Sequence, residues 1–145
     1  MINCGQFSIL GDMTRINIDV FAEPEKHAEP SRNTWAEVSI LAETPQFRAA
    51  FDESIMLWEL TTFREDLKRL HTDLSGEIVW RSVETFVNLK ATMDRLGHIH
   101  WEIDLIRYHP TATLYLEFES DQSYLPALIE QLDSIFMELR SAEAA

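Results

Sequence analysis

The feature that most constrains the fold is a change in hydrophobic periodicity that occurs twice along the chain. In four runs between residues 7 and 51, apolar side chains recur at every second position, the spacing of a strand with one buried face. In residues 57–74 they recur every three or four positions, which is typical of an amphipathic helix. The same change is repeated between residues 78–118 and residues 125–139. The sequence therefore predicts four strands and a helix, twice in succession.

Turn signals divide the first four runs. Gly11 and Asp12 separate residues 7–9 from residues 15–20, which predicts a hairpin. The third run covers residues 34–43. The fourth covers residues 46–51 and is expected to place Phe47, Ala49 and Phe51 on one face.

The first helix is expected to start near Trp58 and to end before Gly76, a residue suited to the left-handed conformation that terminates helices. Its charged residues fall largely off the apolar stripe. The predicted stripe consists of Leu57, Leu60, Phe63, Leu67, Leu70 and Leu74.

In the second half, Gly97 and the His109–Pro110 turn separate further alternating runs. The stretch "DQSYLP", residues 121–126, precedes the second helix. Ser123 is the predicted N-cap, because Pro126 then falls in the first turn, where its missing N–H costs nothing. The apolar face of this helix comprises Leu125, Leu128, Ile129, Leu132, Ile135, Phe136 and Leu139.

Short connections favour antiparallel pairing, since parallel crossovers need a dozen or more residues each. The expected fold is a single α+β domain over residues 1–145, with a bent antiparallel sheet of about eight strands packed against two amphipathic helices. The order is ββββα-ββββα. Residues 23–33 contain two prolines and are expected to form a polar loop.

The charge balance restricts the possible partners. Twelve Lys and Arg against 25 Asp and Glu give a net charge of −13. Such a field repels phosphates, so it disfavours nucleic-acid binding and favours a basic protein partner. The plainer interpretation is that acidity only keeps the protein soluble.

The only cysteine, Cys4, has no partner for an internal disulfide, which favours a reducing compartment. The start "MINCGQFSIL" lacks the features of a signal peptide, and no stretch reaches the ~20 apolar residues of a membrane span. We therefore expect a cytoplasmic protein with no membrane contact.

Catalytic chemistry has little support in the sequence. No nucleophile elbow, phosphate-binding glycine loop, zinc protease motif or dinucleotide fingerprint is present, so no catalytic or cofactor-binding residues are assigned. His98 and His100 are expected on one strand face beside Glu102 and Asp104, where two imidazoles can share a metal. A His-x-His pair without a third ligand is more often solvated, so no metal site is predicted and metal binding by this pair stays open.

The acidic strand residues are the better candidates for binding. Glu102 and Asp104 on one strand would join Tyr115, Glu117 and Glu119 on the next if the two strands pair. Carboxylates interleaved with an aromatic ring suit a basic protein partner. The alternative is the water-facing side of an antiparallel sheet.

Several stretches taken together resemble a known family. They are "NTWAEVSI", "LWELTTFREDLKRL", "GHIHWEIDL" and "LYLEFESDQSYLPALIEQLDSI", which contain Asn33, Trp35, Leu60, Phe63, Leu67, Leu70, Gly97 and the junction Asp121–Pro126. This order is similar to the Wap-type (WapI-like) immunity proteins of bacteria. The resemblance implies a cytoplasmic, non-catalytic protein that neutralises the toxic domain of a polymorphic or contact-dependent toxin, often a nuclease that attacks RNA.

Two other classes of function stay open at this point. A small enzyme or ligand-binding domain would need an apolar pocket with convergent polar groups between the helices and the sheet. A regulatory or self-associating domain would use an exposed sheet edge.

Overall fold

The computed structural model describes residues 1–23 and 34–144, with side chains described as far as residue 140. Except for Glu23, the polar loop predicted at 23–33 lies outside the described residues. Within the described part, the elements in chain order are β1 (Ile2–Gly11), β2 (Thr14–Ala22), β3 (Trp35–Glu43), β4 (Arg48–Met56), α1 (Leu57–Asp73), β5 (Gly76–Arg81), β6 (Val87–Met93), β7 (His98–Arg107), β8 (Ala112–Asp121), a short 3-10 helix η1 (Gln122–Tyr124) and α2 (Leu125–Ala144).

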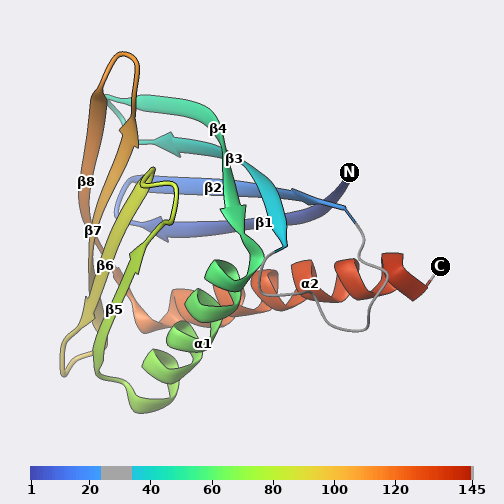
Figure 1. Ribbon diagram of the computed structural model, residues 1–145. Helices are drawn as coiled ribbons and strands as arrows, with labels where there is room; N and C mark the ends of the chain where they lie inside the picture. The colour runs from blue at the N-terminus through green and yellow to red at the C-terminus, as the bar shows by residue number, and fades with distance from the viewer. Residues whose placement is uncertain (24–33, 145) are drawn as a thin grey trace.

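The predicted α+β fold and its order, ββββα-ββββα, are confirmed. The described strands form two four-stranded antiparallel sheets, β1-β2-β3-β4 and β5-β6-β7-β8, each a meander of sequential neighbours. Figure 1 shows the two sheets running in different directions, with α1 and α2 lying together on their inner side. Within the described residues, no helix combines the length and hydropathy needed to cross a bilayer.

The core lies between the helices and the inner faces of both sheets. Period-2 alternation buries every second strand residue, and the helix stripes complete the core from the other side. Phe63 of α1 joins the two sheets, because its ring centroid lies 6.2 Å from that of Phe7 in β1 and 5.1 Å from that of Trp80 in β5. The fold therefore depends on α1 as much as on strand pairing.

The two sheets also meet directly at one corner. The backbone N–H of Asp12, in the turn after β1, donates to the carbonyl oxygen of Glu119 in β8 at 2.8 Å. Gly11 packs so closely there that a β-carbon would lie 2.3 Å from the Phe118 ring. This corner positions β8, which carries several of the predicted binding residues.

Three side-chain or turn predictions are wrong. Phe47 does not share a strand face with Ala49 and Phe51, because β4 begins only at Arg48 and Phe47, before it, is 63% exposed. Leu74 is 46% exposed because it ends α1 instead of continuing the stripe. Leu74, with φ 53°, is the left-handed residue that terminates the helix, and Gly76, with φ 119°, is instead the first residue of β5.

The junction "DQSYLP" also differs from its prediction. Asp121, not Ser123, supplies the capping oxygen, since its Oδ1 accepts the backbone N–H of Ser123 at 2.8 Å. The Ser123 hydroxyl donates to the same carboxylate. The 3-10 turn Gln122–Tyr124 lies between this cap and α2, so Pro126 still falls in the first turn of the α-helix, as predicted.

Candidate functional site

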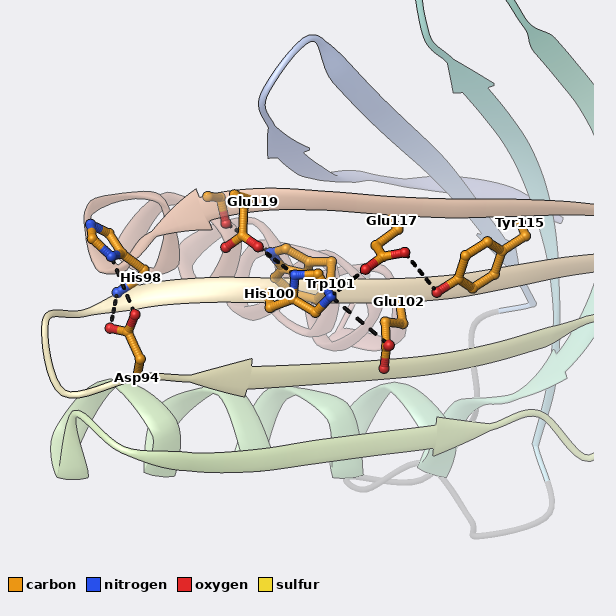
Figure 2. Close-up of polar contacts among 9 residues, drawn as sticks. Asp94, His98, His100, Trp101, Glu102, Tyr115, Glu117 and Glu119 are labelled. Carbon is orange, nitrogen blue, oxygen red and sulfur yellow. Dashed lines mark hydrogen bonds and ion pairs between the residues drawn. The ribbon is translucent and has the colours of Figure 1, made fainter.

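The five residues predicted to bind a partner come together on the outer face of the second sheet. β7 and β8 pair antiparallel, and the register places Glu102 opposite Glu117 and Asp104 opposite Tyr115. Glu119 continues the same row on β8 (Figure 2). We call Glu102, Asp104, Tyr115, Glu117 and Glu119 the acidic face. Their contiguity follows from the pairing, and their role in partner binding stays a prediction.

His100 lies at one end of the acidic face, opposite Glu119 and next to the pair Glu102 and Glu117. Its Nε2 atom lies 2.9 Å from Glu117 Oε1 and 3.9 Å from Glu102 Oε1. Its Nδ1 atom donates to Glu119, its partner in the strand register. The hydrogen bond to Glu119, together with the charges of Glu119, Glu117 and Glu102, raises the pKa of the His100 imidazole despite partial desolvation.

The acidic face carries more negative charge than His100 balances. Glu102 and Glu117 are directly opposite each other, an arrangement of like charges that destabilises a sheet. Asp104 forms no ion pair with any described residue. Desolvation and then the charges of Glu117 and Glu102 raise the pKa of Tyr115, whose hydroxyl donates to Glu117 Oε2 at 3.3 Å. A cation placed here would relieve this repulsion.

Basic residues border the acidic face on β5 and β6. Lys90, whose register partner is Glu102, forms its ion pair with Glu77 of β5 at 3.6 Å. A hollow of about 270 Å³ lies between the two regions, lined by Val79, Arg81, Asn88, Leu89, Lys90, Glu102, Asp104 and Tyr115. The outer surface of the second sheet is therefore both charged and hollowed.

The structure does not bring His98 and His100 to one ligand site. The His98 ring lies beside Asp94 instead, with Nδ1 3.3 Å from Oδ2 (Figure 2). Among the described residues, His100, Glu102 and Glu117 have ligand atoms within 4.8 Å of one another. Sequence reasoning missed Glu117 as a neighbour of His100 because the two residues lie on different strands.

Cys4 is not an accessible nucleophile. The side chain is 3% exposed, and burial raises the pKa of its thiol, so the reactive thiolate is disfavoured.

This chain resembles known proteins in its sequence and in its fold. The sequence profile of the immunity protein WapI-like family matches residues 8–140. A search of curated proteins gives no match.

Solved structures share the fold. The crystal structure of WHY1 from Arabidopsis thaliana superposes with a TM-score of 0.53 at 12% identity, covering 96% of this chain and 92% of that one. The plant transcriptional regulator PBF-2 gives a TM-score of 0.53 at 13% identity, covering 96% of this chain and 84% of that one. At sequence identities this low, the similarity shows a shared fold and nothing about function.

Proposed function

Because the chain belongs to the immunity protein WapI-like family, we propose that it neutralises the toxic domain of a polymorphic or contact-dependent toxin by binding it through the acidic face. The toxin domain is basic, and a nuclease that attacks RNA is the class that fits best, since such enzymes carry positive charge to hold phosphates. The protein acts by occlusion and performs no chemistry of its own. It works in the cytoplasm, where such a toxin finds its target.

One observation carries the assignment of the surface. Glu102 and Glu117 are held opposite each other, and their ion-pair partner among the described residues is His100, with no lysine or arginine pairing with either. Like charges in this position lower the stability of the free protein. A basic partner would turn the same repulsion into attraction, so the arrangement suits binding better than it suits folding.

The net charge of −13 supports the same proposal at long range. Complementary charge accelerates the encounter of two proteins, and dissolved salt screens it with a Debye length of about 10 Å at 0.1 M. The association rate constant with the toxin domain should therefore fall steeply as ionic strength rises, while the dissociation rate constant changes less.

The first experiment is protection. If a neighbouring gene encodes a protein with a basic C-terminal domain of the expected toxin class, that domain is expressed in bacterial cells with and without this chain. Growth should be restored only when both are present, and a stable complex should co-purify. If cells die regardless of the immunity chain, the proposed function is wrong.

The second experiment maps the surface. Asp104→Lys with Glu119→Lys reverses two charges on the acidic face, and Glu43→Lys with Glu130→Lys reverses two exposed charges on β3 and α2. Both pairs change the net charge equally. The first pair should weaken toxin binding by at least tenfold, measured by calorimetry, and the control pair should alter it far less. Equal losses would show that only the overall charge matters.

A ligand pocket between helix and sheet has weaker support. The hollow between α2 and the strands, lined in part by Leu10 and Trp101, encloses about 40 Å³. The hollow between α1 and β5, lined in part by Trp58 and Trp80, encloses about 110 Å³. Both volumes are smaller than the ~300 Å³ or more of typical ligand sites. No observation favours an enzymatic function as a second candidate.

A further inference from the structure

We propose that His100, Glu102 and Glu117 form a binding site for one divalent transition-metal ion, with zinc as the best-matched metal. The inference concerns the chain alone and does not depend on the toxin. It rests on the distances among three ligand atoms, on the groups that orient them and on the rigidity of the strands that carry them.

The ligand atoms are spaced as a metal requires. Ligands that bind zinc tetrahedrally at ~2.0–2.2 Å lie roughly 3.3–3.6 Å from one another. His100 Nε2 is 2.9 Å from Glu117 Oε1 and 3.9 Å from Glu102 Oε1, so the observed separations bracket this range. Small rotations of the two exposed or half-exposed carboxylates would equalise them.

Further contacts orient two of the three ligands. The Nδ1–H of His100 donates to Glu119, which leaves Nε2 directed at Glu117 and Glu102. A histidine that binds a metal almost always donates its other ring N–H to such a carboxylate. Glu117 is held in turn, because its second oxygen accepts the Tyr115 hydroxyl at 3.3 Å (Figure 2). These are the supporting contacts that a metal centre needs.

The backbone keeps the ligands in place. His100 and Glu102 project from the same face of β7, and Glu117 projects from the directly paired position on β8. Sites built on paired strands hold their geometry better than sites on loops. A divalent ion would also neutralise the opposed pair Glu102 and Glu117, whose two charges a protonated His100 balances only in part.

The donor set selects the class of metal. One imidazole nitrogen with two carboxylate oxygens suits zinc, which accepts both kinds of ligand, better than calcium or magnesium, which prefer oxygen alone. Three protein ligands leave a fourth position open. The site faces outward on the acidic face, so water or a side chain of a bound protein would complete it.

Zinc titration of the tag-free, EDTA-treated chain tests the proposal. Calorimetry should show one equivalent of Zn²⁺ bound with a micromolar dissociation constant. His100→Ala should weaken binding by at least ~100-fold, and Glu119→Gln, which replaces the supporting carboxylate with a neutral amide, by ~10-fold or more. His98→Ala is the matched control on the same strand face and should bind as the wild type does.

Two measurements on the wild-type chain test the proposal even if the His100→Ala variant does not fold. Adding one equivalent of Zn²⁺ should shift the ring-nitrogen resonances of His100 and leave those of His98 in place, and Co²⁺ should give the visible absorption of a tetrahedral centre. Unchanged His100 resonances would overturn the proposal. So would millimolar binding by the wild type, or wild-type affinity in the His100→Ala chain.

Discussion

Glu59 is a carboxyl group that the fold encloses, since its residue is only 2% exposed. Its Oε2 accepts the backbone N–H of Met56 at 2.9 Å, which caps the start of α1. Its Oε1 accepts the indole N–H of Trp80 at 3.1 Å and the backbone N–H of Val83 at 3.3 Å. One side chain therefore connects the helix start to β5 and to the turn that follows it.

Glu59→Ala should lower the free energy of unfolding by roughly 3 kcal/mol, because it leaves buried donors without an acceptor. Glu59→Gln should cost less, since the amide oxygen still accepts a hydrogen bond. Urea denaturation provides the measurement. Glu65→Ala, an exposed position of the same helix, should stay within ~0.5 kcal/mol of wild type. A Glu59→Ala chain as stable as this control would show that the three contacts are not made.

The titration of His100 tests the geometry of the acidic face without a partner. In EDTA, the His100 pKa should lie above its ordinary value, and Glu119→Gln should lower it, because a neutral amide replaces the carboxylate whose hydrogen bond and charge favour the protonated ring. Ring-nitrogen NMR across a pH series would follow the change, with Glu130→Gln as a distant control. A His100 pKa at or below its ordinary value would contradict the contacts described here.

The raised pKa of His100 also predicts how the stability of the fold depends on pH. Because the folded-state pKa of His100 is raised, protonated His100 stabilises the fold fully below the ordinary histidine pKa. That contribution is lost as the pH rises through the folded-state pKa. The wild type should therefore lose more stability across this window than Glu119→Gln does.

At the scale of elements, periodicity was enough to predict the order of strands and helices. Burial on one face forces a period of two in strands and about 3.6 in helices, so Val38, Ile40, Leu60 and Leu67 all lie where the pattern indicates. Helix ends were predicted less well. Asp121 and Ser123 are both residue types that cap helices. The 3-10 turn between Asp121 and α2 determines that the carboxylate of Asp121, and not the hydroxyl of Ser123, is the capping group.

The acidic face could be predicted only in part. Alternation assigns Glu102 and Glu117 to outward faces, but their contact depends on strand register, which alternation alone does not give. The needed signal was the His109–Pro110 turn, because His100 and Glu119 are equidistant from it and pair in the structure. His98 was misjudged for a similar reason, since Asp94 reaches it across a turn.

The end of α1 gives a prediction at this scale. Leu74 adopts φ 53°, a left-handed conformation that costs a residue with a β-carbon about 1 kcal/mol. Leu74→Gly should therefore raise the free energy of unfolding by up to about 1 kcal/mol, measured in urea. Leu74→Ala keeps the β-carbon and should give no gain. If both variants lose stability equally, the side chain of Leu74 matters more than its backbone.

At the scale of the whole molecule, the acidic face depends on how the two sheets are joined. α1 packs against both sheets through Phe63, and the corner between β1 and β8 fixes the strand that carries Glu117 and Glu119. The outer surface of the second sheet is thus positioned by residues of the first. Binding and stability should respond together to changes at this corner.

Gly11→Ala tests that connection. A β-carbon at residue 11 would lie 2.3 Å from the Phe118 ring and 2.7 Å from the Glu119 carbonyl oxygen, the atom that accepts the Asp12 N–H. The ring can rotate only within a packed core, and the carbonyl belongs to the backbone, so the sheets must separate locally. We expect a loss of about 1–3 kcal/mol in the free energy of unfolding, measured by urea denaturation.

The same variant should displace the end of β8 and weaken zinc binding at His100 and Glu117, although residue 11 touches neither. Gln6→Ala, an exposed position of β1, is the control and should leave both quantities near wild type. Loss of stability with unchanged zinc affinity would mean that the β7–β8 pairing alone sets the site. A fully stable Gly11→Ala chain would mean that the two sheets are not in close contact at this corner.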